Sequence, residues 1–173
     1  MEIVIMGYMG SGKSTIGKYI SKKNNLNFID LDNYIEQREK LSIKEVFSQK
    51  GEIYFRIKEA FYLKEILDSK KNYVLSLGGG TPCYGTNIGL IKESNALSFY
   101  LKGNIQTLIQ RLRNEKESRP LIASLNDEQL LEYIGKHLFE RAPFYEQASF
   151  KIVINNKSVK EIAEDFISIL SRQ

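Results

Sequence analysis

The stretch Gly7-Tyr8-Met9-Gly10-Ser11-Gly12-Lys13-Ser14-Thr15 matches the phosphate-loop pattern G-x-x-x-x-G-K-[ST] at every fixed position. The apolar run of residues 3–6 before it predicts a buried parallel strand. Residues 15–23 after it have the apolar spacing of a helix. The alternative is a glycine-rich turn that binds nothing, but a chance match would lack this order of strand, loop and helix.

The glycine, lysine and serine residues of the loop each have a task in holding a nucleoside triphosphate. Gly10 and Gly12 let backbone N–H groups approach phosphate oxygens, and the helix that begins near Lys13 adds its positive end. The ammonium group of Lys13 is suited to lie against the β- and γ-phosphates and balance their charge. The Ser14 hydroxyl is suited to ligate Mg²⁺. The loop alone therefore predicts a nucleoside triphosphate site, without naming the reaction.

The bulk composition indicates one globular domain. The chain has 173 residues, of which 42% are hydrophobic and 27% charged, with a formal charge of +4 and a pI near 9.0. This mild excess suits anionic ligands, whereas nucleic-acid binding would need a dense basic face or interleaved aromatic residues. The single cysteine, Cys83, fits a reducing compartment and has no assigned task. We see no targeting segment or bilayer-length apolar run, so we expect a cytoplasmic protein.

Two carboxylates, Asp30 and Asp32, follow the second predicted strand, residues 27–29. Ligands of open parallel sheets lie beyond the carboxyl ends of the strands. Asp30 could therefore hold Mg²⁺, directly or through water, and Asp32 could orient or deprotonate a hydroxyl. The alternative is that Asp32 only caps the helix predicted over residues 33–40. Beside a phosphate loop, we favour the functional interpretation.

Three further features are candidates for the same site. The strand predicted over residues 73–77 runs into Gly78-Gly79-Gly80, a second glycine loop that we expect to line the site. The polar residues 113–121 have the composition of a mobile surface segment, and Arg119 within it can neutralise charge on a transferring phosphoryl group. Without a phosphate loop in the chain, Arg119 would be interpreted as a solvated loop residue. The forked guanidinium of Arg141 suits a carboxylate.

The remaining periodicity predicts alternating helices and strands. Ser42 predicts a helix cap, and Gly51 predicts a break between two helices. His137, the only histidine, is predicted to be a surface residue of a helix, because no acid or thiol stands at motif spacing from it. The predicted helices cover residues 43–49, 52–68, 104–114, 127–139 and 158–170, and the predicted strands residues 96–101 and 150–154.

In their order and separations, these motifs resemble the shikimate kinase family over nearly the whole chain. The resemblance is carried by the phosphate loop, Asp30-Leu31-Asp32, Phe55-Arg56, Gly78-Gly79-Gly80, Arg119-Pro120-Leu121 and Arg141-Ala142-Pro143-Phe144-Tyr145. It implies an α/β fold with three α/β/α layers and a five-stranded parallel sheet of order 2-3-1-4-5. It also implies one P-loop kinase domain over residues 1–173, with a mobile lid at about 113–125 and a substrate-binding helical region at about 32–62.

The resemblance further implies a reaction and a role for each motif. The γ-phosphoryl group of ATP would pass to the 3-hydroxyl of shikimate, a step of aromatic amino-acid biosynthesis. Asp32 would bind the shikimate hydroxyls and is the candidate base. Arg56, which spacing alone would leave as a solvated residue, would grip the shikimate carboxylate together with Arg141. The backbone of residues 78–80 would contact the ring, Arg119 would face the phosphates, and Ser14 with Asp30 would hold Mg²⁺.

The motifs identify the adenine-contacting residues less well than the other site residues. Arg111 or Arg113 could stack on the base, and residues 155–157 could lie at its edge. Leu31 stands where the family more often has Ser or Thr, and we expect it to point away from the site. The expected nucleotide contacts are Gly10, Ser11, Gly12, Lys13, Ser14, Thr15, Arg113, Arg119, Asn155 and Lys157.

Two other functions stay open at this point. One is a related small-molecule kinase of the same fold, such as a gluconate kinase, and the other is a nucleotide-binding module without turnover. Two arginines suited to a carboxylate, together with the triple glycine, favour shikimate. Nothing in the sequence disables Lys13, Ser14 or the aspartates. We expect a monomer whose partners are ATP and shikimate, with no nucleic acid and no membrane.

Overall fold

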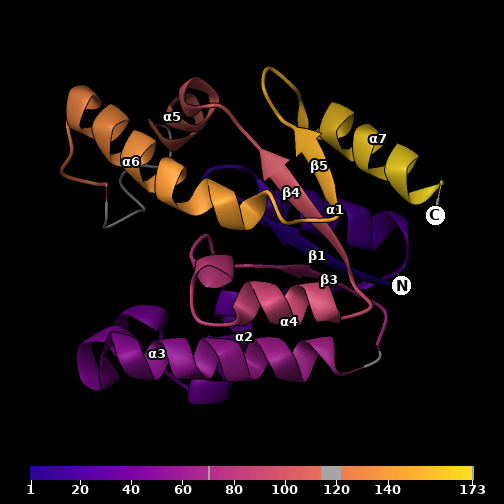
Figure 1. Cartoon of the computed structure of the whole chain (residues 1–173), viewed down its shortest axis with the longest axis horizontal. Helices are drawn as coiled ribbons and strands as arrows, with labels where there is room; N and C mark the ends of the chain where they lie inside the picture. Colours follow the sequence, from indigo (N-terminus) through magenta and orange to yellow (C-terminus); the bar gives the residue numbers. More distant parts are fainter. Residues whose placement is uncertain (70, 114–121, 173) are drawn as a thin grey trace.

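Five parallel strands form one central sheet in the order β2-β3-β1-β4-β5 (Figure 1). The computed structural model describes residues 1–69, 71–113 and 122–172. The central strand β1 pairs in register with both neighbours, so that Ile3 lies opposite Val74 and Leu97. Helices cover both faces, which explains why this strand is an unbroken apolar run. The strands are β1 (Glu2–Met6), β2 (Asn27–Asp30), β3 (Tyr73–Ser76), β4 (Leu97–Lys102) and β5 (Phe150–Val153).

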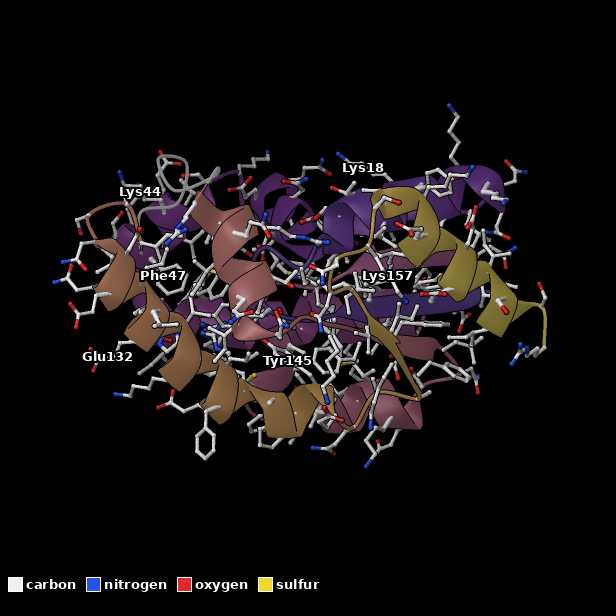
Figure 2. The ribbon with its side chains drawn as sticks, turned by 90° about the horizontal axis from the view of Figure 1, so that it is seen from above. Lys18, Lys44, Phe47, Glu132, Tyr145 and Lys157 are labelled. Atoms are coloured by element: carbon white, nitrogen blue, oxygen red, sulfur yellow. The ribbon has the colours of Figure 1, made fainter. Side chains whose placement is uncertain are left out.

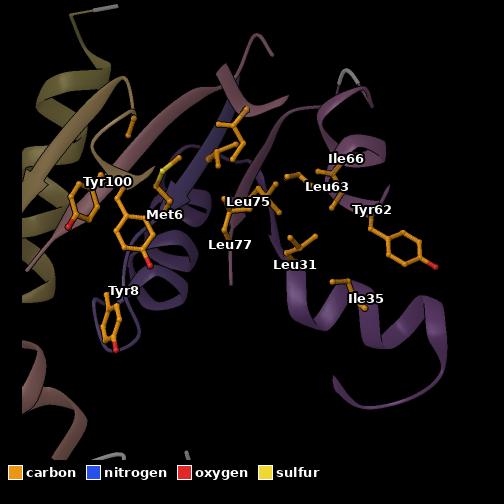
Figure 3. Close-up of a cluster of buried hydrophobic side chains, with 14 of the residues drawn as sticks. Met6, Tyr8, Leu31, Ile35, Tyr62, Leu63, Ile66, Leu75, Leu77 and Tyr100 are labelled. Atoms are coloured by element: carbon orange, nitrogen blue, oxygen red, sulfur yellow. The ribbon is translucent and has the colours of Figure 1, made fainter. Parts of the chain in front are cut away.

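Alternate side chains of the strands point into two separate cores. Ile3 and Ile5 face α1 (Lys13–Lys23) and α7 (Val159–Leu170). Val4, Met6 and Leu75 face the remaining helices (Figure 3). The remaining helices are α2 (Leu31–Glu39), α3 (Ile43–Leu67), α4 (Asn87–Glu93), α5 (Ile105–Arg113) and α6 (Asp127–Tyr145), with a 3₁₀ turn at Thr81–Cys83. The predicted three-layer architecture and strand order are confirmed.

The start of α2 excludes the alternative that Asp32 is a helix cap. Its N-cap is Asp30, whose carboxylate accepts a hydrogen bond from the Asn33 backbone N–H at 3.4 Å. Asp32 is the second residue of the helix and is therefore not the cap. Leu31 is fully buried in the core, as expected for a residue that points away from the site. Asp32 is left with its carboxylate in the first turn of a helix, where the dipole favours a negative charge.

Two other helices show where local signals succeed and fail. Ser42 forms the expected capping box with Glu45, and Gly51 at φ 84° breaks α3 as predicted. Helix α6 was expected to end at Phe139, but it continues through Pro143 to Tyr145. A proline removes only one backbone hydrogen bond near the end of a helix, and the burial of Tyr145 stabilises the extra turns.

His137 on α6 is half-buried rather than a surface residue. Its ring packs against Tyr133 with the ring centroids 4.2 Å apart. Its Nδ1 atom is buried without a hydrogen-bond partner in the described part of the chain. Of the predicted lid at 113–125, residues 114–121, and Arg119 with them, lie outside the described residues. Across the described ranges, we find no helix with the length and apolar character needed to cross a membrane.

Candidate active site

The phosphate loop leaves the carboxyl end of β1 in a shape that requires glycine. Gly10 and Gly12 have φ values of 76° and 91°, which side chains other than glycine rarely adopt. A Cβ atom on Gly10 would also lie 2.9 Å from Cγ of Leu112. Helix α1 begins at Lys13 without a side-chain cap. Its first N–H groups are therefore suited to receive an anion at the positive end of the helix.

A cleft of about 580 Å³ opens beside this loop. Lys13 stands at its edge, where its Nζ atom donates to the backbone carbonyls of Gly7 at 2.9 Å and Tyr8 at 3.0 Å. The ammonium group is thus held over the loop that would carry the phosphates. The lining comprises Met9, Gly10, residues 12–16, Asp30, Asp32, residues 77–79, Arg111, residues 157–159 and Ile162.

Hydroxyl and carboxylate oxygens meet at the base of the cleft. The Ser14 hydroxyl donates to the Asp30 carboxylate at 2.8 Å and lies 3.3 Å from the hydroxyl of Ser76. Within the described ranges, no three His, Cys, Asp or Glu side chains gather into a metal-binding cluster. The oxygen donors of Ser14 and Asp30 nevertheless fit Mg²⁺, which keeps several waters and needs few protein ligands. Ser76 was not expected from the sequence.

The carboxylate of Asp32 faces the glycine loop at the end of β3. A Cβ atom on Gly78 would lie 3.0 Å from Oδ1 of Asp32, so a side chain at this position would press on the Asp32 carboxylate. The pKa of Asp32 is raised to about 6, mainly by burial and to a smaller extent by the nearby Asp30 and Glu59 carboxylates, while Lys13 opposes the increase. Such a group is mainly ionised at neutral pH yet basic enough to accept a proton from a bound hydroxyl.

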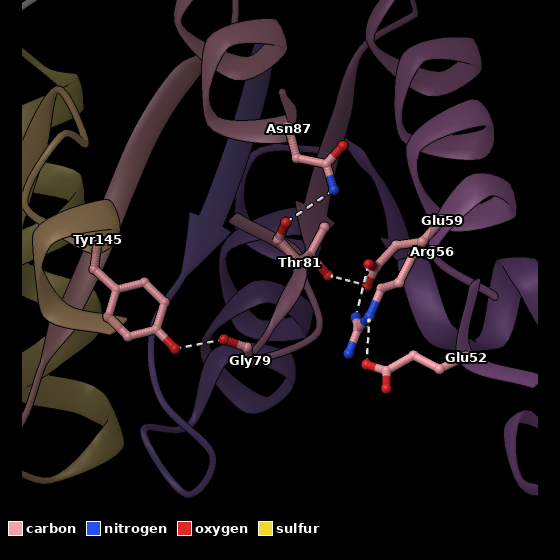
Figure 4. Close-up of polar contacts among 7 residues, drawn as sticks. All are labelled: Glu52, Arg56, Glu59, Gly79, Thr81, Asn87 and Tyr145. Carbon is pink, nitrogen blue, oxygen red and sulfur yellow. Dashed lines mark hydrogen bonds and ion pairs between the residues drawn. The ribbon is translucent and has the colours of Figure 1, made fainter. Parts of the chain in front are cut away.

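The guanidinium of Arg56 is fixed by a buried acid that the sequence analysis did not single out. Arg56 Nη1 donates to Glu59 at 2.8 Å, and the Thr81 hydroxyl donates to the same carboxylate at 2.7 Å (Figure 4). The guanidinium carbon also lies 3.5 Å from the ring centroid of Tyr84. The signal for Glu59 was its i,i+3 spacing from Arg56 on a predicted helix.

Arg56 and Arg141 approach the same glycine turn from different helices. A Cβ atom on Gly80 would lie 3.5 Å from Nη1 of Arg56, and one on Gly79 would lie 3.7 Å from Nη1 of Arg141. In the described part of the chain, no carboxylate lies within ion-pair distance of Arg141, although the residue is half-buried. A half-buried cation without an anionic partner is unfavourable, so this arrangement suits a negatively charged ligand.

Three of the expected nucleotide contacts are not brought to the cleft. Arg113 pairs with Asp127 at 2.8 Å and its side chain is 53% exposed. The Asn155 side chain accepts a hydrogen bond from the Asn104 backbone at 2.8 Å. The Ser11 side chain is buried beneath the loop, so this residue presents only its backbone. For Arg113 the cause is helical geometry, since residues two apart on α5 point to nearly opposite sides.

Arg111 reaches the cleft instead of Arg113. Its guanidinium donates to the Ser11 carbonyl at 3.1 Å, and to the carbonyls of Ile154 at 3.4 Å and Lys157 at 3.3 Å. It thereby joins the phosphate loop to the loop between β5 and α7. Lys157 lies beside α7 in Figure 2, and its ammonium group pairs with Asp165 of that helix at 2.6 Å.

Comparison with known proteins agrees with this geometry. A family model described as shikimate kinase matches residues 9–171. The chain belongs to the shikimate kinase family. A curated shikimate kinase from Flavobacterium johnsoniae is 46% identical over 170 residues, which cover 98% of this chain and 99% of that one. Family membership makes the chain an ATP-dependent kinase, in agreement with its phosphate loop.

Solved shikimate kinases have the same fold over their full length. The 1.7 Å crystal structure of the enzyme from Bacteroides thetaiotaomicron superposes with a TM-score of 0.91 at 34% identity, covering 99% of this chain and 98% of that one. The enzyme from Acinetobacter baumannii in complex with shikimate gives a TM-score of 0.85 at 30% identity, and the match covers 99% of this chain and 94% of that one. The likeness therefore extends over nearly the whole length of this chain and of both solved structures.

Proposed function

We propose that this chain transfers the γ-phosphoryl group of ATP to the 3-hydroxyl of shikimate, giving shikimate 3-phosphate and ADP. The observation that carries the proposal is the approach of Arg56 and Arg141 to one glycine turn, beside Asp32 and the phosphate loop. A small planar carboxylate that must be held rigidly for in-line attack is well matched by two guanidinium groups. The family and the shikimate complex of a relative support the choice of acid.

The nucleotide half of the proposed site acts by position and charge. The N–H groups of the phosphate loop and of the first turn of α1 hold the phosphates, and Lys13 balances the charge of the β- and γ-phosphates. Ser14 and Asp30 hold Mg²⁺, which when bound neutralises charge on the phosphate oxygens. Arg119, which lies outside the described residues, is proposed to face the transferring group. Arg111 takes the place of Arg113 beside the base.

The acceptor half of the proposed site activates one hydroxyl. Arg56 and Arg141 hold the carboxylate, and the backbone of residues 78–80 contacts the ring. Asp32 hydrogen-bonds to the reacting hydroxyl and takes its proton as the new O–P bond forms and the bond to ADP breaks. The protein contributes little covalent chemistry, so its residues serve orientation and electrostatic stabilisation. We further propose that the enzyme works as a monomer in the cytoplasm.

A coupled ADP-release assay with shikimate and gluconate as acceptors tests the proposal. We expect turnover with shikimate alone, and a loss of roughly 10²-fold or more in kcat for Lys13→Ala. Arg56→Lys and Arg141→Lys should each raise KM for shikimate while KM for ATP changes little, because Lys lacks the planar fork. Arg38→Lys, on an exposed arginine of α2, is the matched control.

The same assay separates the competing functions. Preferred turnover of gluconate would indicate the related small-molecule kinase. ATP binding without ADP release for any hydroxy acid would indicate a nucleotide-binding module. An unchanged KM for shikimate in both arginine variants would contradict the assignment of the carboxylate clamp.

A further inference from the structure

One fully buried hydroxyl, that of Tyr145, contacts the glycine turn and has no role in the function proposed above. Tyr145 is 0% exposed at the end of α6, and its ring packs against Tyr100 with the centroids 5.2 Å apart. Its hydroxyl donates a hydrogen bond to the backbone carbonyl of Gly79 (Figure 4). A tyrosine placed only to fill the core would not need this polar contact, since phenylalanine has nearly the same shape.

The hydrogen bond orients the peptide between Gly79 and Gly80. In a trans peptide the carbonyl and the following N–H point in opposite directions. Because the Gly79 carbonyl is turned toward Tyr145, the Gly80 N–H is turned away from α6. Figure 4 places Tyr145 and Arg56 on opposite sides of this segment, so the N–H is directed toward the side on which Arg56 lies. Three consecutive glycines have no side chains to fix this orientation themselves.

The same hydroxyl lies next to the second arginine of the clamp. Tyr145 follows Arg141 by one helical turn, which brings their side chains to one side of α6. Burial raises the pKa of Tyr145 strongly, and the neighbouring Arg141 guanidinium opposes this increase. Arg141 also approaches Gly79, as described above. The phenolic oxygen thus bonds to the glycine turn and lies close enough to the Arg141 guanidinium to interact with its charge.

We infer that Tyr145 is a positioning residue, whose hydroxyl holds the Gly79–Gly80 peptide and the Arg141 guanidinium in the arrangement that receives the acid substrate. This inference rests on the proposed function, because it assigns the effect of the residue to the binding of shikimate. Tyr145 does not touch the substrate itself. It acts through the two groups that do.

The test compares Tyr145→Phe with Tyr100→Phe. Both variants remove one phenolic hydroxyl from the same aromatic contact, and the Tyr100 hydroxyl has no hydrogen bond to the described residues. For Tyr145→Phe we expect KM and the calorimetric Kd for shikimate to rise about three- to tenfold, with KM for ATP within about twofold. Tyr100→Phe should leave all three values unchanged. Equal effects in both variants, or a parallel rise of KM for both substrates, would overturn the inference in favour of general destabilisation.

A double-mutant cycle separates this inference from the proposed function. If Tyr145 acts through Arg141, Tyr145→Phe should raise KM for shikimate clearly less in an Arg141→Lys background than in the wild type. Fully additive effects would overturn a role through Arg141. If Arg141→Lys raises KM but Tyr145→Phe does not, the positioning role is wrong and the function stands. If neither change affects shikimate binding, the proposed role of Arg141 in holding the shikimate carboxylate is wrong, and the inference about Tyr145 falls with it.

Discussion

The guanidinium of Arg56 and the carboxylate of Glu59 lie 2.8 Å apart, one helical turn from each other on α3. Glu59 is only 1% exposed, and its second carboxylate oxygen accepts a hydrogen bond from the Thr81 hydroxyl at 2.7 Å. The buried acid therefore joins α3 to the segment that follows the glycine turn. An arginine on the exposed face of a helix would sample many rotamers. The hydrogen bond to Glu59 instead holds the Arg56 guanidinium in one orientation before any ligand binds.

Replacing Glu59 by glutamine should weaken the binding of shikimate. The amide keeps the shape but removes the charge that orients Arg56, so we expect KM for shikimate to rise about tenfold with a smaller change in kcat. Initial-rate kinetics with each substrate varied in turn measure this effect. Glu52→Gln, on the exposed acid 3.5 Å from the same arginine, is the control and should change KM by less than about twofold. Equal effects of the two substitutions would refute a special role for the buried acid.

The pH dependence of the reaction should report Asp32. With a pKa of about 6, Asp32 is protonated and inactive as a base below that pH, so kcat/KM should rise through pH 6 and level off above it. A pH–rate profile of the wild type measures the inflection. The residual activity of Asp32→Asn should be orders of magnitude lower and lack this inflection. Normal turnover in Asp32→Asn would remove the residue from its proposed role.

The ionised carboxylate of Asp32 should lower the stability of the ligand-free protein. A pKa raised from 3.8 to about 6 means that folding disfavours the ionised form, a penalty that is absent below about pH 3.8 and fully developed above pH 6. The difference corresponds to an upper limit of about 3 kcal/mol. Asp32→Asn should therefore have a higher Tm than the wild type at pH 8, and the gap should shrink at pH 5. Thermal melts at both pH values measure it, and a pH-independent gap would contradict this account.

Arg111 and Arg113 provide a matched pair on one helix. Arg111→Ala removes hydrogen bonds to three backbone carbonyls beside the cleft, so we expect KM for ATP to rise about tenfold or more. Arg113→Ala breaks one exposed ion pair with Asp127 and should leave KM for ATP within about twofold. Kinetics at saturating shikimate distinguish the two. The reverse order of effects would reinstate Arg113 as the nucleotide contact.

Removing the Ser14 hydroxyl should weaken the binding of Mg²⁺. Ser14→Ala removes the hydroxyl that lies 2.8 Å from Asp30, and we expect the Mg²⁺ concentration for half-maximal activity to rise about tenfold or more. A Mn²⁺ titration of the enzyme–ADP complex by electron paramagnetic resonance should show the same loss of affinity without relying on turnover. Ser48→Ala is the control, because the Ser48 hydroxyl donates to the Glu45 carbonyl of its own helix. An unchanged metal requirement would remove Ser14 from the metal site.

The sequence by itself determined the features that depend on neighbouring residues. The phosphate loop, the Ser42 cap and the Gly51 break each follow from a short pattern whose geometry is set by the residues within it. The resemblance to the family rested on the order and separation of several such patterns, and the strand order was what that resemblance implied. Both are confirmed.

Only the tertiary structure decided which side chains from different elements come into contact. It buried Glu59 against Arg56, brought Arg111 rather than Arg113 to the cleft, and set the Tyr145 hydroxyl on Gly79. Contacts of this kind join residues from different helices and loops, and their formation depends on how two elements pack rather than on either sequence alone. A local pattern can place a residue on a helix, but the rotation of that helix against the sheet decides what the residue touches.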